Sequence, residues 1–345
     1  MKRILIITLA TILCGAFVGC KKIYNEPNVS GFRSDGTSQA LFSVAPGRQV
    51  RFSRGNLQYN PKNDSWRFAD HQYTIIGRDN KNISSTYNGW IDLFGWGTSG
   101  ANWGSTAYQP WSSSTEPTDY FTARADNDLT GEYAQGDWGV HNAITNGGNT
   151  AGKWRTLTAE EWRYLVNAYA DGPRKNRCCM AKIKFRAPMD GAYDGYEGYM
   201  GYDNSGEIEG LILLPDNWEM PSFGQRLVTD PAANDYGPFI ENCKYELEEW
   251  CTLEAAGAVF LPLTMYRDGT AVKEGVRDDN GHWTESDGYY WSASCVSSDC
   301  AKAFQMFYHR LEDHTYMTSW TQVMQVALAN KSGHLGLAVR LVQDY

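Results

Sequence analysis

Basic clusters are scarce in this sequence of 345 residues, which has 31 lysines and arginines, 40 aspartates and glutamates and a formal net charge of −9. After the N-terminal Lys2-Arg3, basic residues gather only at Lys21-Lys22 and at Arg174-Lys175-Asn176-Arg177. Nucleic-acid phosphates are bound by concentrated basic surfaces. We therefore expect no nucleic acid among the partners.

Long apolar runs are confined to the first twenty residues. A basic start at Met1-Lys2-Arg3 precedes a short apolar core from Ile4 to Leu13, and Gly19 stands before Cys20. This order is typical of a secretory signal. Its core is shorter than the roughly 20 apolar residues that a permanent membrane helix needs. The pattern predicts export.

The segment Val18-Gly19-Cys20 resembles the bacterial lipobox, in which a small residue precedes a cysteine that is lipidated. The resemblance implies cleavage before Cys20, a diacylglycerol on its thiol and acylation of the freed amine. Several acyl chains anchor a protein durably, where one chain binds marginally. The alternative is an ordinary signal peptide with a chance cysteine.

These features divide the chain into a lipoprotein signal peptide at 1–19, a lipidated flexible tether at 20–40 and a single domain at 41–345. Lys21, where an aspartate would favour retention in the inner membrane, indicates an outer-membrane lipoprotein of the cell envelope. The membrane is then one partner, through the anchor. Periplasmic and surface-exposed orientations both stay open.

Metal-binding and hydrolytic motifs are also lacking. There is no Cys-x-x-Cys pair and no zinc spacing of cysteine and histidine. The histidines are scattered without an evident serine or cysteine partner, so we expect no catalytic residues and no metal. An exported chain can oxidise its cysteines, but the sequence does not choose among their pairings. The cysteines after the anchor are Cys178, Cys179, Cys243, Cys251, Cys295 and Cys300.

Aromatic residues and glycine are abundant, with 13 Trp, 21 Tyr, 13 Phe and 34 Gly. This composition favours turns and short strands. Apolar and polar residues alternate at 41–44 and 50–53 around a turn at Pro46-Gly47, as in half-buried strands. Further strands are predicted near 55–59, 66–68, 183–185, 211–214, 259–262, 289–292, 303–307 and 337–342. For 80–152 we expect short strands and long loops, packed by Trp90, Phe94, Trp96, Trp103 and Trp138.

Two helices stand out. Thr158 and Glu161 form a capping box, and Trp162, Leu165, Val166 and Tyr169 fall on one apolar stripe that ends at Asp171-Gly172-Pro173. A second helix is predicted from Tyr245 to about Ala256. Its core-facing residues are Leu247, Trp250 and Cys251, with Gly257 as the C-terminal cap.

Several blocks resemble a known family. Trp154-Arg155-Thr156-Leu157-Thr158-Ala159-Glu160-Glu161-Trp162 resembles a segment of formylglycine-generating-enzyme-like domains, which are elaborated C-type-lectin-like folds. Tyr290–Ser294 and Gly336–Val342 are similar to the ending of the Fibrobacter-type major paralogous domain of bacterial lipoproteins. The resemblance implies an α+β fold with two main helices, short antiparallel strands and long loops. It also implies that the first and last strands pair.

The same resemblance raises an enzymatic alternative. The enzyme oxidises a substrate cysteine with oxygen at a pair of copper-binding thiols near its C-terminus, and Cys295 and Cys300 have the matching spacing. The flanking Trp291-Ser292-Ala293-Ser294 differs from the enzyme's lead. A structural or incidental pair is therefore the favoured interpretation, and no cofactor is expected.

One acidic loop leaves calcium as an alternative cofactor. Carboxylate oxygens are calcium ligands, and Asp190, Asp194, Glu197, Asp203 and Glu207 lie within one Gly/Tyr-rich stretch. They match no EF-hand pattern. A solvated acidic loop is the favoured interpretation.

The segment 294–332 corresponds to part of the exposed ligand face in C-type-lectin-like folds. Its mixture of Tyr, His, Ser and Trp suits recognition, because Tyr and Trp offer rigid contact area. An ordinary polar surface is the equally weighted alternative. The candidate ligand-binding residues are Tyr308, His309, Arg310, His314, Tyr316 and Trp320.

The sequence therefore predicts a lipid-anchored, non-enzymatic binding protein that presents a C-type-lectin-like domain to a glycan or protein ligand, as an adhesin does. A copper-dependent cysteine oxidase centred on Cys295 and Cys300 is the second hypothesis. A structural subunit of the envelope or of an appendage is the third.

Overall fold

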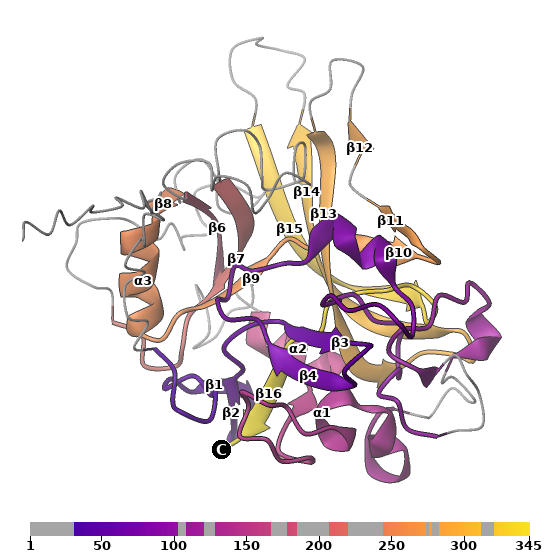
Figure 1. Ribbon diagram of the computed structural model, residues 1–345. Helices are drawn as coiled ribbons and strands as arrows, with labels where there is room; N and C mark the ends of the chain where they lie inside the picture. The colour runs from indigo at the N-terminus through magenta and orange to yellow at the C-terminus, as the bar shows by residue number, and fades with distance from the viewer. Residues whose placement is uncertain are drawn as a thin grey trace, which may run out of the picture.

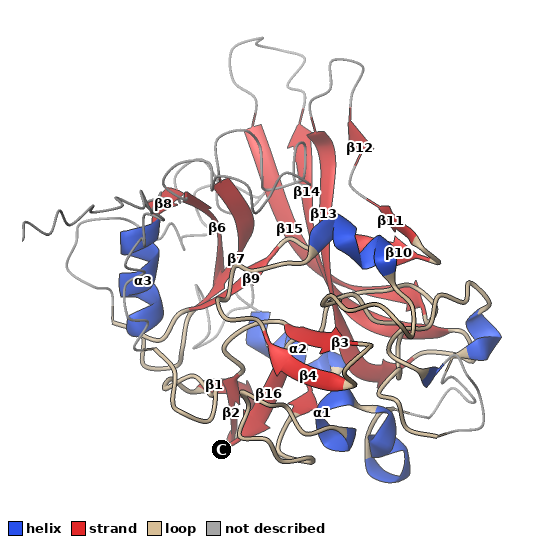
Figure 2. Ribbon diagram, viewed as in Figure 1, coloured by secondary structure: helices blue, strands red, loops and turns tan. Residues whose placement is uncertain are grey.

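The computed structural model is a mixed α+β protein, built mostly of small antiparallel sheets with few helices (Figures 1 and 2). The predicted α+β class is confirmed at that level. The structure describes residues 31–102, 108–120, 128–166, 178–184, 207–219, 244–273, 276–277, 283–311 and 321–345. No helix within these ranges is long and apolar enough to cross a membrane.

The first sheet joins both ends of the described chain. Its strand order is β1-β2-β16-β5, with β1 at Phe42–Ala45, β2 at Arg48–Phe52, β5 at Arg155–Thr156 and β16 at Leu341–Asp344. The alternation that predicted β1 and β2 buries Phe42, Val44, Val50 and Phe52. The last strand pairs with β2 and not with the first strand β1, which corrects the expected pairing. β16 pairs with β2 along one edge and with β5 along the other.

A hairpin of β3 (Leu57–Asn60) and β4 (Ser65–Phe68) follows, as the sequence predicted. The expectation of short strands in 80–152 is wrong for its described part, where isolated bridges and short helices replace them. These helices are η1 (Gly77–Asn82), η3 (Pro117–Asp119), η4 (Gly131–Gly136) and α1 (Trp138–His141). Phe94, Trp96 and Trp138 are fully buried there. Trp90 is only half-buried, and Trp103 lies outside the described residues.

Helix α2 (Ala159–Val166) begins at the predicted capping box. The Glu161 amide donates to Thr158 Oγ1 at 3.2 Å, and the Thr158 amide donates to the Glu161 carboxylate at 2.9 Å. Trp162 lies on the buried face and stacks on Phe304, with ring centroids 4.7 Å apart. Tyr169 and the predicted stop at 171–173 lie outside the described residues.

A third unit packs helix α3 (Leu247–Ala255) on a sheet of order β8-β6-β7-β9. The strands are β8 at Lys244–Glu246, β6 at Cys178–Lys184, β7 at Glu207–Leu213 and β9 at Val259–Pro262. The buried face of α3 carries Trp250, Leu253 and Glu254, whereas the predicted Leu247 and Cys251 are only half-buried. Gly257 follows the helix with φ +103°, a conformation that favours glycine, so the predicted cap is confirmed.

The C-terminal sheet is the longest. Its order is β12-β13-β14-β15, with β12 at Val276–Arg277, β13 at Trp283–Cys295, β14 at Cys300–Leu311 and β15 at Thr321–Ser332. Strands of this length contradict the expected short strands, and the strand predicted near 303–307 lies within β14. A small hairpin of β10 (Tyr266–Asp268) and β11 (Ala271–Lys273) lies beside it. In Figure 1 the long strands project away from β1, β2 and β16.

Residues 31–40, which we call the strap, correct the expected tether. They pack on the domain, with Thr37 and Ser38 almost fully buried. The Ser38 amide donates to the Phe52 carbonyl at 2.8 Å, and Thr37 bridges Ser53. Asp35 forms an ion pair with Lys153 at 3.0 Å. The folded part therefore begins by residue 31 and not at residue 41.

Candidate functional site

The predicted ligand-binding residues fall in the C-terminal sheet or beyond the described chain. Tyr308, His309 and Arg310 lie on the central strand β14, where their backbones pair with Met324, Val323 and Gln322 of β15. His314, Tyr316 and Trp320 lie outside the described residues, so their part in ligand binding stays a prediction. The structure therefore puts three of the six on one strand of the long sheet.

Four residues that the sequence analysis did not single out meet on this sheet, and we call them the tyrosine–lysine cluster: Tyr266, Tyr289, Gln305 and Lys331. Gln305 Nε2 donates to the Tyr289 hydroxyl at 3.2 Å, and Lys331 Nζ lies 4.2 Å from the centre of the Tyr289 ring. The Tyr266 ring meets the Tyr289 ring edge-on, with centroids 5.7 Å apart. A cation over a tyrosine face is an attractive contact. Apart from Tyr289, which is buried, the cluster is half-exposed.

A polar triad lies next to the tyrosine–lysine cluster. Ser332 Oγ and His334 Nδ1 are 2.8 Å apart, and His334 Nε2 is 3.4 Å from the Asp268 carboxylate. This arrangement corrects the expectation that no histidine has a serine partner. The residues come from β15, the turn after it and β10, so only Ser332 and His334 are close in sequence.

Two backbone amides beside the triad are already engaged in backbone hydrogen bonds. Hydrolases that use this set of side chains also hold backbone N–H groups free to bind an oxyanion. Here the amides that follow Ser332 and His334 are engaged, since Gly333 donates to the Asp299 carbonyl and Leu335 donates to the Ser332 carbonyl. These two amides are therefore not available to bind an oxyanion.

A buried arginine positions β10 beside the cluster. Arg267 is fully buried, and its guanidinium donates to the backbone carbonyls of Gly269, Leu93 and Ser112. Burial lowers its pKa to about 10, while the nearby Tyr120 and Asp268 oppose that shift. Because Tyr266 and Asp268 flank Arg267, this anchoring fixes where both side chains leave the strand.

The two candidate redox cysteines stand at the ends of the turn between β13 and β14. Cys295 Sγ donates to the Ser297 carbonyl at 3.3 Å and lies 3.8 Å from the Cys300 carbonyl. Burial raises the pKa of Cys300, Ser297 lowers it, and Asp299 raises it further. A thiolate is the form that binds copper or attacks a substrate. The surroundings of Cys300 therefore disfavour its thiolate form.

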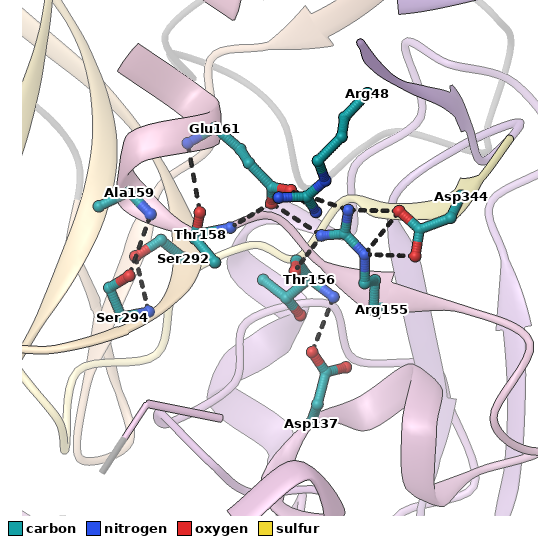
Figure 3. A network of polar contacts seen from close by, with 10 residues as sticks. All are labelled: Arg48, Asp137, Arg155, Thr156, Thr158, Ala159, Glu161, Ser292, Ser294 and Asp344. Carbon is teal, nitrogen blue, oxygen red and sulfur yellow. Dashed lines mark hydrogen bonds and ion pairs between the residues drawn. The ribbon is translucent and has the colours of Figure 1, made fainter. Parts of the chain in front are cut away.

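Next to the turn between β13 and β14, a polar network fixes helix α2 against the first sheet (Figure 3). Glu161 accepts from Arg155 at 2.7 and 2.9 Å and from Arg48 at 2.7 Å. Arg155 also contacts Asp344 of β16 at 2.6 Å. The Ala159 amide donates to Ser294 Oγ at 3.1 Å, which ties the start of α2 to β13 just before Cys295. The network therefore links helix α2 to the first sheet and to strand β13.

Most residues of the remaining predicted sites lie outside the described part of the chain. Asp190, Asp194, Glu197 and Asp203 lie outside the described residues, and Glu207 is the first residue of β7. Within the described ranges, no group of three or more His, Cys, Asp and Glu side chains is arranged to hold a metal ion. Cys20 lies outside these ranges, so lipidation stays a prediction.

Local patterns gave no signal for the tyrosine–lysine cluster or the triad. Tyr266 and Asp268 follow β9 directly, whereas Lys331, Ser332 and His334 close β15 more than sixty residues later. The pairing of Arg267 with Gly336 and the contact between His334 and Asp268 bring the two segments together.

Comparison with known proteins adds nothing to these observations, since no protein-family model, no curated protein and no solved structure matches the chain.

Proposed function

We propose that the chain is a lipid-anchored, non-enzymatic binding protein whose ligand face is the C-terminal sheet β13–β14–β15. The observation that carries this proposal is the tyrosine–lysine cluster together with the adjacent triad. Two tyrosines, an amide, an ammonium and an imidazole lie close together on the C-terminal sheet, the turn after β15 and the adjacent strand β10. Tyrosine provides contact area at low entropic cost, and the polar groups provide hydrogen bonds. Such a set fits a glycan or a polar protein surface.

The fold that we propose for this domain is an elaborated C-type-lectin-like fold of the formylglycine-generating-enzyme-like or Fibrobacter-type group. Two features support it. The final strand β16 lies between β2 and β5, so the ends of the domain are adjacent. Helix α2, which carries the resembling segment, packs against the buried faces of β13 and β14 through Tyr290 and Phe304.

The ligand face is tested with glycan and peptide arrays, using the full chain purified in detergent. Lys331→Met and Tyr266→Ala are expected to weaken any specific binding by about tenfold or more, as loss of a contact worth about 1.4 kcal/mol would. Lys302→Met is the matched control, because Lys302 lies on the same sheet and none of the contacts described above involves its side chain. Equal binding by all three variants would rule out this face.

Copper binding distinguishes the oxidase hypothesis from the non-enzymatic proposal. If Cys295 and Cys300 bound Cu(I), the wild-type chain would take up the metal and Cys295→Ser would not. We expect no difference between the two proteins in copper content or oxygen uptake. A stoichiometric copper that is lost in Cys295→Ser would overturn the non-enzymatic proposal.

The triad is tested with a fluorophosphonate, which labels nucleophilic serines. We expect no labelling of Ser332, because the neighbouring amides are engaged in backbone bonds. Labelling that disappears in Ser332→Ala and in His334→Ala would show a hydrolase instead.

Anchoring at Cys20 and an outer-membrane location are part of the proposal. Metabolic labelling with a radioactive fatty acid is expected to mark the wild type and not Cys20→Ser, and the label should fractionate with the outer membrane. Protease treatment of intact cells then distinguishes a surface-exposed domain, which is cut, from a periplasmic one. Co-purification of one stoichiometric envelope protein would favour the structural-subunit hypothesis.

A further inference from the structure

Strand β15 forms the edge of the longest sheet, and it differs from every other described sheet edge. It spans Thr321–Ser332, pairs along its whole length with β14 and shows no register shift. Among the described strands, none pairs with its other side. The opposite edge of this sheet, β12, has two residues and a bulge.

The outer strands of the other two four-stranded sheets are β1, β5, β8 and β9. Each has four residues or fewer, β1 has an irregular register, and β9 ends in Pro262. Short length, bulges and proline are the usual ways in which proteins prevent pairing at a sheet edge. β15 has none of them.

The sequence of β15 also lacks protective residues. From Thr321 to Asn330 it contains no charged residue, no proline and no glycine, and Lys331 is its single charge. Edge strands that remain unpaired usually carry charges, lysine above all. A long, regular and uncharged edge is one that recruits another strand.

The hydrogen-bond register shows which backbone groups face outward. Gly333 N donates to the Asp299 carbonyl, so the odd-numbered residues of β15 bond to β14. Because bonding alternates along an antiparallel pair, the N–H and C=O groups of Gln322, Met324, Val326, Leu328 and Asn330 point to the outer edge. These groups form a ready template for a further strand.

We propose that β15 pairs antiparallel with β15 of a second copy of this chain, which would join two C-terminal sheets into one. A second copy presents an edge of the same length and the same spacing of donors and acceptors. In an antiparallel pair of β15 strands, Lys331 of one copy would face Lys331 of the other only if the strands overlapped at residues 330 to 332 alone. Registers with a longer overlap therefore bring no like charges together. The contact uses the same surface on both chains and therefore closes as a dimer.

The association state of the full chain in a density-matched detergent tests this proposal by sedimentation velocity. The wild type is expected to be dimeric at micromolar concentration. Val326→Pro removes an outward N–H without removing a bond to β14, and its ring blocks the approaching strand. It should weaken the dimer by about 100-fold or more. Val326→Thr keeps the N–H and the β-branched shape, and it should remain dimeric.

A monomeric wild type overturns the proposal, and so does a Val326→Pro protein that folds and stays dimeric. If Val326→Pro does not fold, residue-resolved hydrogen exchange on the wild type decides. The even-numbered amides from 322 to 330 should exchange more slowly by about tenfold or more in the dimer than after dilution. Equal exchange in the two states would overturn the proposal, because the dimer contact would then lie elsewhere on the chain.

Discussion

Glu161 is the residue whose replacement tests the polar network around helix α2 most directly. Its side chain is 4% exposed, and it accepts bonds from Arg155, Arg48 and the Thr158 amide. Glu161→Gln keeps the shape and one acceptor oxygen. It removes the charge and turns an amide NH₂ toward two guanidinium groups.

The expected cost follows from these contacts. Loss of one partner from a buried ion pair costs about 3–5 kcal/mol. Arg155 keeps the exposed Asp344 as a second anionic partner, so we expect Glu161→Gln to lower the free energy of unfolding by about 2–3 kcal/mol. For a domain of this size that corresponds to a fall in Tm of about 4–10 °C.

Glu160→Gln is the matched control on the same helix. Glu160 is 73% exposed and pairs with the exposed Arg163 at 2.8 Å, so its loss should cost about 0.5 kcal/mol or less. Urea unfolding followed by circular dichroism compares the two variants. If Glu161→Gln unfolds at the same urea concentration as Glu160→Gln, the network does not hold α2 to the first sheet as argued.

Three further predictions concern other parts of the fold. The indole N–H of Trp154 donates to the Gly147 carbonyl at 2.8 Å, whereas that of Trp162 has no acceptor among the described residues. Trp154→Phe should therefore destabilise the protein by about 1 kcal/mol more than Trp162→Phe. Equal urea midpoints for the two variants would contradict this. Burial raises the pKa of Asp35, but bonds from Thr37 and Lys153 outweigh it and lower the pKa from 3.8 to about 2. The ionised Asp35 therefore stabilises the strap above about pH 4, and this stabilisation is lost as the pH falls toward 2. Solvent screening limits it to about 1 kcal/mol. In Asp35→Asn, hydrogen exchange of residues 31–40 should no longer show this pH dependence. Burial raises the pKa of Cys178 to about 12, so iodoacetamide at pH 8 should modify the half-buried Cys251 and leave Cys178 unmodified in the folded protein; equal modification of the two would refute that.

Local signals predicted the elements whose residues interact with near neighbours. The capping box of Thr158 and Glu161 and the glycine after α3 were read correctly, because both motifs depend on contacts within one helical turn. The buried face of α3 was read only in part. Trp250 is buried as predicted, but Leu253 and Glu254 share that face in place of Cys251, because the position of the β8-β6-β7-β9 sheet decides which stripe is covered.

Longer-range arrangement was misjudged where pairing decided it. Within 294–332 the sequence predicted only a short strand near 303–307, yet β14 and β15 each extend over twelve residues because they pair with each other along their whole length. The strap was expected to be part of a flexible tether. It is ordered because Arg51 donates to its backbone carbonyls and Lys153 pairs with Asp35.

The sequence by itself determined the α+β class, both principal helices and the opening hairpin, since these depend on spacing, capping and hydrophobic runs. Only the tertiary structure decided the order of the sheets, the packing of the strap on the domain and the meeting of Tyr266, Tyr289 and Lys331. The physical reason is that these residues, far apart in the chain, become neighbours through backbone bonds such as those between Arg267 and Gly336. No local pattern encodes which strand will lie beside which.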